Sequence, residues 1–185
     1  MAKEREAPGE LELVRGFVNT LDVEEGTDEL TTPDQLRSWL AGLGLLDPGD
    51  RLTESDLHRT LELREALRAL LLANYGIEPP AAATATLDAA ACAANLRARF
   101  SADGTAGLVP EAAGLDAALG RLLAAVYGAM ADGSWRRLKA CRAQDCYWVF
   151  WDATKNRSGA WCDMGVCGNR AKARSYRERH RDIVA

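Results

Sequence analysis

Four cysteines near the C-terminus constrain the fold of this chain most strongly. They follow the pattern Cys141-x4-Cys146-x15-Cys162-x4-Cys167 in a sequence of 185 residues. Two cysteine pairs separated by a loop of this length are typical of a four-thiolate zinc site, because each pair can aim both sulfurs at one point. We expect one structural zinc ion; two disulfides or a redox site are the alternatives. Four sulfur ligands leave no open position for water, which argues against metal catalysis.

The segment that holds these cysteines is too short to fold by hydrophobic burial alone. It runs from Ser134 to Ala185 and contains four of the five cysteines and four of the five tryptophans of the chain. Modules of about 50 residues commonly need a metal or disulfides for stability. The N-terminus carries charges of both signs with no apolar stretch behind it, so we expect no secretory signal and a cytoplasmic, reducing location. Such a location favours a metal over disulfides.

Charge divides the chain at the same place. The whole sequence has a net charge of −4, but Ser134 to Ala185 carries +7 and the first 133 residues carry −11. A basic tail on an acidic body is a pattern of proteins that contact nucleic acid, and we expect DNA as the partner. The alternative is that the tail docks on its own acidic body. No apolar run approaches the roughly 18 residues of a membrane helix, so we expect no membrane partner.

Helical spacing of apolar residues predicts a mainly α-helical domain over residues 10–133, after a frayed segment at 1–9. Capping boxes at Thr32 and Thr53 predict the starts of two helices. Alternating residues on either side of Asp103-Gly104 predict the one β-hairpin of this domain. The expected helices cover residues 10–22, 33 to 42 or 44, 54 to about 76, 81–94 and 115–130.

The C-terminal module, residues 134–185, has a different pattern. Tyr147–Asp152 is typical of a strand, residues 154–159 of a turn, and Ala160–Trp161 of the returning strand. A helix over Ala171–Arg181 then begins beside the metal. A short hairpin followed by a helix resembles a treble-clef zinc finger. We expect the aromatic residues to form its small core; a base-stacking role for one of them is the alternative.

The last helix carries a stripe of arginines. Arg170, Arg174, Arg177 and Arg181 are spaced so that they share one face, where their like charges repel. Phosphate would relieve this repulsion, and a solvated basic face is the alternative. The candidate nucleic-acid-binding residues are Lys155, Arg157, Arg170, Lys172, Arg174, Arg177 and Arg181. We expect Asn169 to cap the helix or to orient a metal thiolate, rather than to contact a base.

The segment Cys162–Arg174, CDMGVCGNRAKAR, resembles the CGNR zinc-finger family, and Leu138–Arg142 and Asn156–Ser158 fit the same family. The N-terminal domain resembles the ABATE domain of stress-induced transcription regulators through Phe17–Thr20 and the helix at 57–72. This resemblance implies that Cys141, Cys146, Cys162 and Cys167 bind the metal. It also implies a bacterial regulator whose finger binds DNA, with basic family positions at Arg157, Arg170, Lys172 and Arg174.

We therefore expect a transcription regulator that binds DNA through its zinc finger and basic helix. The N-terminal domain would be a sensor, holding a small molecule or a protein, or an oligomerisation module that forms homodimers. The alternative is a zinc-stabilised protein-interaction module that contacts the transcription machinery.

Residues outside the finger give little sign of catalysis. We expect no enzyme, because His58 and His180 fit no ligand or triad pattern and no glycine-rich phosphate loop occurs. Cys92 is interpreted as a buried small residue. Weak candidates for a polar site in the N-terminal domain are Arg15, Asn19, Arg64 and Arg68, for which surface charge or salt bridges between helices are the alternative.

Overall fold

A computed structural model describes residues 6–181, without the side chain of Arg181. Residues 1–5 of the segment expected to be frayed lie outside this range. Ala7, in the same segment, is buried, and its N–H donates to Glu12 Oε2 at 2.7 Å. Ordered structure therefore begins before residue 10.

Helices are the main regular structure of the described chain. They are α1 (Leu11–Val18), α2 (Pro33–Gly42), α3 (Glu54–Leu72), α4 (Ala81–Ala93), α5 (Gly114–Ala131) and α6 (Asn169–Arg181). Short 3-10 turns follow α3 at Ala73–Tyr75 and α5 at Ser134–Arg137. The capping boxes at Thr32 and Thr53 are both formed, which confirms the predicted starts of α2 and α3.

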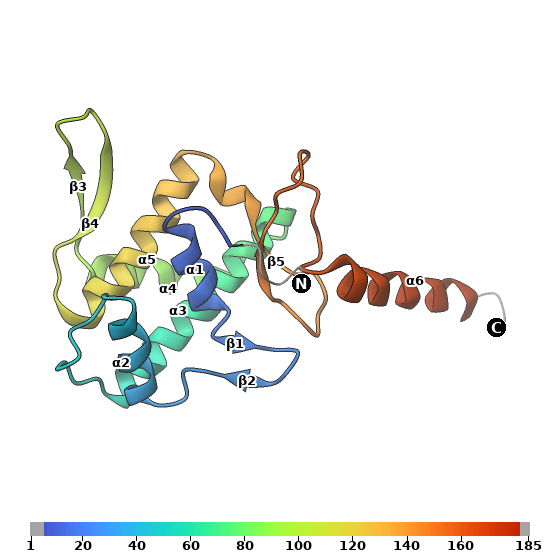
Figure 1. Ribbon diagram of the computed structural model, residues 1–185, viewed down its shortest axis with the longest axis horizontal. Coiled ribbons are helices and arrows are strands. Elements are labelled where there is room, and N and C mark those ends of the chain that lie inside the picture. The colour runs from blue at the N-terminus through green and yellow to red at the C-terminus, as the bar shows by residue number, and fades with distance from the viewer. Residues whose placement is uncertain (1–5, 182–185) are drawn as a thin grey trace.

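The strands form three two-stranded antiparallel hairpins in the described residues. They pair β1 (Leu21–Asp22) with β2 (Thr27–Asp28), β3 (Leu96–Phe100) with β4 (Ala106–Pro110), and β5 (Leu138–Ala140) with β6 (Val149–Trp151). The β3–β4 hairpin is the one that the sequence predicts. It projects from the helical body at the end away from α6 (Figure 1).

The prediction of a first helix over residues 10–22 was wrong at its C-terminal end. The helix stops at Val18, and the chain then forms the β1–β2 hairpin. Two side chains favour this turn: Thr20 Oγ1 donates to the carbonyl of Phe17, and Asp22 Oδ1 accepts from the N–H of Glu24. Such side-chain bonds to the backbone compete with a continuing helix.

The main core lies between α1, α3 and α5. Its fully buried side chains include Phe17, Leu67 and Leu122, one from each helix. Helix α5 is long and apolar enough to cross a membrane by composition, contrary to the expectation that no such run exists. Half of its residues are buried within this core, as in the central helix of a folded domain.

Helix α4 covers the outside of this core, and none of its residues is buried. Cys92 lies on it and is exposed, so its interpretation as a buried residue was wrong. An alanine-rich helix has no strongly apolar face that fixes which side turns inward, and periodicity could not place this cysteine.

Strand β6 joins the two parts of the molecule. Val149 on one side belongs to the main core, together with Leu138 and Ala140 of β5. Phe150 on the other side packs in a second cluster with the four cysteines. Alternation along a strand places neighbouring side chains on opposite faces, so β6 serves both cores at once.

Candidate metal centre

The four cysteines form one buried cluster. Their Sγ atoms all lie within 4.8 Å of one another. Cys162 Sγ is 3.6 Å from Cys146 Sγ and 3.7 Å from Cys167 Sγ. Zinc bonded at about 2.3 Å to four tetrahedral sulfurs would hold them about 3.8 Å apart, whereas a disulfide bond is about 2.05 Å long. The cluster is arranged to bind one metal ion as a structural zinc site.

The first cysteine pair lies in the turn between β5 and β6. The N–H of Cys141 donates to the carbonyl of Trp148 at 2.8 Å, and the N–H of Cys146 donates to that of Ala143 at 3.0 Å. The finger's hairpin is therefore not the expected one, since β6 pairs with β5 and Ala160–Trp161 forms no strand. Strands that flank a tight cysteine turn are already adjacent in space, which favours this pairing.

The second cysteine pair is held by one turn of π-helix, Met164–Gly168. Asp163 caps this turn, because its Oδ1 accepts from the N–H groups of Gly165 at 2.7 Å and Val166 at 3.1 Å. A Cβ atom at Gly168 would lie 2.5 Å from Met164 Sδ, so a larger residue there would displace the Met164 side chain. These contacts fix the direction in which α6 leaves the metal site.

The closeness of the thiols shifts their pKa values in opposite directions. Hydrogen bonds from Cys146 and then Cys162 lower the pKa of Cys141 to about 4. The contact with Cys141 raises the pKa of both Cys146 and Cys162. Four thiolates this close would repel each other. A bound dication would offset part of that repulsion and allow all four to bind as thiolates.

Arg170 contacts the cluster directly. Its Nη2 donates to Cys167 Sγ at 3.2 Å, and its Nη1 lies 2.9 Å from Glu24 Oε1 and 3.5 Å from Asp145 Oδ2. The contact with Cys167 is the main cause that raises the pKa of Arg170. This residue of the predicted basic stripe therefore bridges a metal ligand, the β1–β2 hairpin and the first cysteine turn.

Asn169, the first residue of α6, is hydrogen-bonded to the π-helical turn that holds the second cysteine pair. Its Nδ2 donates to the carbonyl of Gly165 at 2.9 Å, four residues earlier. The thiolate contact expected as one role of Asn169 is made by Arg170 instead.

A buried ion pair shapes the loop between the two cysteine pairs. Lys139 Nζ lies 2.8 Å from Asp152 Oδ2, and both side chains are almost fully buried. Asp152 also accepts from the N–H groups of Thr154 and Gly159, while Lys139 donates to the carbonyls of Arg157 and Gly159. Sequence reasoning missed this pair, although Lys139 stands between two apolar residues in a short strand.

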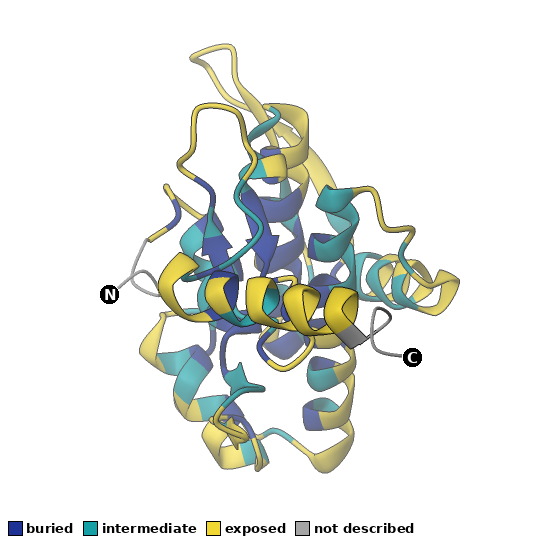
Figure 2. Cartoon of the chain, turned by 90° about the vertical axis from the view of Figure 1, so that its right-hand side faces the viewer, coloured by how far each residue is buried: buried dark blue, intermediate teal, exposed yellow. Residues whose placement is uncertain are grey.

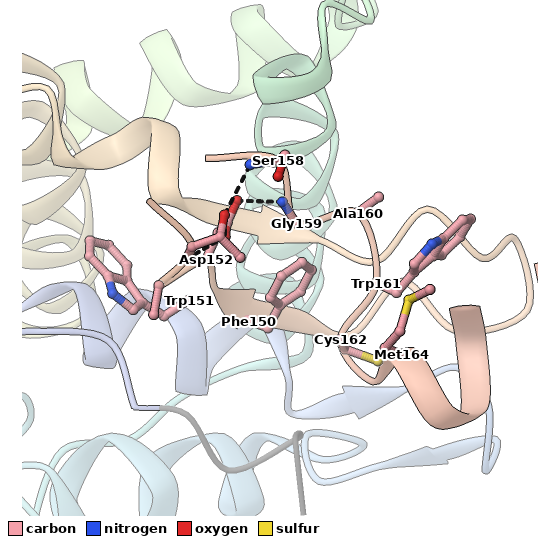
Figure 3. Close-up of a pocket in the computed structure, with 11 residues that line it drawn as sticks. Phe150, Trp151, Asp152, Ser158, Gly159, Ala160, Trp161, Cys162 and Met164 are labelled. Atoms are coloured by element: carbon pink, nitrogen blue, oxygen red, sulfur yellow. Dashed lines mark hydrogen bonds between the residues drawn. The ribbon is translucent and has the colours of Figure 1, made fainter. Parts of the chain in front are cut away.

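A cleft of about 450 Å³ opens between β6 and this loop (Figure 3). Its lining includes Phe150, Trp151, Trp161, Cys162 and Met164. Phe150 is buried against the cysteines, and Trp161 packs partly against them. The expected core role of the aromatic residues is thus seen for these two side chains.

The remaining candidate nucleic-acid-binding residues lie on two exposed segments at the same end of the molecule. Lys155 and Arg157 are exposed in the loop after β6, and Lys172, Arg174 and Arg177 are exposed on α6. Helix α6 extends away from the body (Figure 1), and Figure 2 shows its surface exposed along nearly its whole length. The side chain of Arg181 lies outside the part that the structure describes.

The weak polar candidates of the body belong to buried or paired contacts. Arg64 forms two 2.8 Å hydrogen bonds with Asp28, one from each terminal nitrogen, and Arg15 pairs with Glu12. Arg68 Nη1 donates to the carbonyl of Tyr147 at 3.0 Å, so it reaches the finger.

Asn19 and the two histidines complete the list of sequence candidates. Asn19 also reaches the finger, where it contacts Val149. His58 lies 3.3 Å from Glu62, and His180 stacks on Tyr176 on the exposed surface of α6.

Comparison with protein families agrees with this geometry. Residues 137–180 match the CGNR zinc finger, and residues 11–133 match the ABATE family, described as "Putative stress-induced transcription regulator". No curated protein matches the chain. The two matched segments are the ones that carry the cysteine cluster and the helical core. The chain therefore belongs to the ABATE family and ends in a CGNR zinc finger.

Proposed function

We propose that the protein is a bacterial, cytoplasmic transcription regulator that binds duplex DNA through α6 and the loop after β6. The observation that carries this proposal is an exposed basic helix that starts directly at the metal cluster and projects from an acidic body. The module has a net charge of +7, against −11 for the first 133 residues. Phosphate contacts supply most of the affinity of such basic segments for nucleic acid.

The metal site would act structurally in this function. Four thiolates saturate zinc, so the ion holds the two cysteine turns together and offers no position for a substrate. Asn169 and Arg170 tie the first turn of α6 to the ligand loop, so zinc binding also fixes the helix in space. The families are of the regulator and zinc-finger types, and we propose no enzymatic activity.

The basic residues of the finger would have two roles, positioning the helix and contacting phosphate. Arg170 already contacts a sulfur and two carboxylates, which suits a residue that positions the helix. Phosphate contacts then fall to Lys172, Arg174 and Arg177 on α6, with Lys155 and Arg157 on the loop. Arg181 belongs to the same proposed set by its spacing along the helix.

The helical body would sense a ligand or protein, or form homodimers. Asn19 hydrogen-bonds to the backbone of β6, and Arg68 to the backbone just before β6, so a change in the body can reach the finger. A single finger with one short helix has a small footprint on DNA, and a dimer would give more contacts.

A protein-interaction module is the second candidate, and one contact favours it. Arg170 is held by the carboxylates of Glu24 and Asp145, so the finger accepts acidic protein groups within its own chain. The same basic face could contact an acidic surface of the transcription machinery.

Fluorescence anisotropy with a randomised duplex pool across a salt series tests the proposed function. We expect affinity to fall steeply with salt, to be lost with Cys162→Ser, and to weaken with Arg174→Ala. Arg121→Ala, which removes an exposed arginine of α5, is the matched control and should bind like the wild type. No binding even at low salt would overturn the DNA proposal and favour the protein-interaction alternative.

A further inference from the structure

The β3–β4 hairpin is an amphipathic arm. Its register places Leu96 opposite Pro110, Ala98 opposite Leu108 and Phe100 opposite Ala106. Residues directly opposite each other in an antiparallel pair share a face, so these six apolar side chains lie on one side. The other side carries Arg97 and Arg99.

Among residues 6–181, only those near the base of the apolar face cover it. There α5 approaches closely at Gly120, where a Cβ atom would lie 2.9 Å from Pro110 Cβ and 2.6 Å from Ala94 Cβ. Farther out, Ala98 and Ala106 are exposed, and Phe100 is 84% exposed. A two-stranded hairpin is marginally stable in water by itself, so an arm with an open apolar face is suited to packing against a partner.

We propose that this apolar face is the dimerisation surface of the protein and that its occupant is the same arm of a second copy. The inference deepens the oligomerisation role proposed for the body, and it does not depend on DNA binding. Two identical apolar faces related by a two-fold axis form a closed, self-complementary contact. Because the arm and α6 lie at opposite ends of the molecule (Figure 1), pairing there leaves both basic helices exposed.

Charge favours a second copy over other occupants. Residues 94–113 carry two arginines, one aspartate and one glutamate, so the arm is neutral on a body of net charge −11. Two copies repel each other through most of their body surface and least through the arms. The neutral arm also gives nucleic acid no net positive charge to bind.

The polar side of the arm contains charges of both signs. Arg97 Nε lies 3.0 Å from Glu111 Oε2, and Arg99 Nη2 lies 3.7 Å from Glu111 Oε1. Arg97 and Arg99 lie on the side away from the apolar face, so this polar side stays in water when two arms pair through their apolar faces. The arginines of the arm are therefore paired within each copy, and the apolar face alone makes the proposed contact.

Sedimentation equilibrium of the full, zinc-loaded chain over a concentration series tests the proposal. We expect twice the mass of the chain for the wild type and a dimer dissociation constant at least about tenfold higher for Phe100→Ser. Ala98→Asp, which places a charge in the same face, should give a monomer. Tyr127→Ser, which removes an exposed aromatic residue from α5 away from the arm, is the matched control and should remain dimeric.

Circular dichroism of each variant separates loss of pairing from loss of fold, since the arm variants should keep the helix content of the wild type. A wild type that stays monomeric at all concentrations overturns the proposal. The proposal is also overturned if Phe100→Ser and Ala98→Asp remain dimeric like the wild type. Failure of the DNA proposal is distinguishable, because a dimeric wild type that binds no duplex would contradict that function alone.

Discussion

Asn19 and Val149 are joined by two buried hydrogen bonds across 130 residues of sequence. Asn19 Nδ2 donates to the carbonyl of Val149 at 2.9 Å, and the N–H of Val149 donates to Asn19 Oδ1 at 2.7 Å. The amide of Asn19 thus takes the place of a neighbouring strand for β6. Since β6 also presents Phe150 to the cysteine cluster, this contact links the helical body to the metal site.

Replacement of Asn19 by leucine should destabilise the protein. The change keeps the side-chain size but leaves the N–H and carbonyl of Val149 buried without partners, and each such group costs about 1–3 kcal/mol. We expect the free energy of unfolding in urea to fall by roughly 2–5 kcal/mol. This is less than the summed cost of the two unpaired groups, because the site can relax. Asn156→Leu, in an exposed loop, should change stability little. Equal effects of the two substitutions would contradict the importance of the Asn19 contact.

Removal of the metal should affect the body as well as the finger. A strong chelator is expected to unfold the cysteine turns and α6, and to lower the melting temperature of the helical body without unfolding it. The reason is that Leu138, Ala140 and Val149 of the finger's hairpin are buried in the main core. The measurement is far-ultraviolet circular dichroism during heating, with Cys162→Ser as a metal-free comparison.

Two other results of the chelation experiment would contradict this expectation. A body that melts at the same temperature with and without metal would be independent of the finger. A chain that loses all helical signal on chelation at room temperature would be one cooperative unit that needs zinc to fold.

Local sequence signals predicted the parts of the fold that depend on neighbouring residues. The cysteine spacing predicted the cluster, Thr32 and Thr53 predicted helix starts, and Asp103-Gly104 predicted the β3–β4 turn. The longest of these patterns, from Cys141 to Cys167, spans 26 positions, and in each the spacing is itself the signal.

Contacts between distant segments could not be predicted from such signals. Asn19 and Arg68 bind backbone groups near β6, and a backbone carbonyl leaves no trace in the sequence. In the sequence, Lys139 looks like one more surface charge of a basic module. In the structure it is buried and forms an ion pair with Asp152. Arg170 fitted the spacing of an exposed stripe, yet its position at the first turn of α6 places it against Cys167 and Glu24.

The Lys139–Asp152 pair should make stability depend on pH in the acid range. Burial by itself would raise the pKa of Asp152, but hydrogen bonds from Lys139 and Thr154 lower it to about 2. The pKa of an unfolded aspartate is about 3.9, so the pair's contribution to stability is present above that pH and lost as the pH falls toward 2. Asp152→Asn leaves Lys139 buried and unpaired, and should cost about 3–5 kcal/mol at pH 7.

The difference in free energy of unfolding between the wild type and Asp152→Asn is the quantity to measure. It should shrink between about pH 4 and pH 2, because the protonated aspartic acid then resembles asparagine. Metal release in acid affects both proteins and cancels in the difference. A difference that stays constant over this range would show that Asp152 is not ionised in the folded protein.

Arg170 and Arg174 should differ in what they control, although both are arginines of α6. Arg170 donates to Cys167 Sγ, and loss of a hydrogen bond to a metal ligand typically costs about 10- to 100-fold in metal affinity. We expect Arg170→Ala to weaken zinc binding by about tenfold in competition with a chromophoric chelator. Arg174→Ala, at an exposed position one turn later, should bind zinc like the wild type and lose affinity for DNA. Equal zinc affinities for the two variants would mean that the guanidinium of Arg170 does not stabilise the thiolate, and its place at the cluster would then depend only on Glu24 and Asp145.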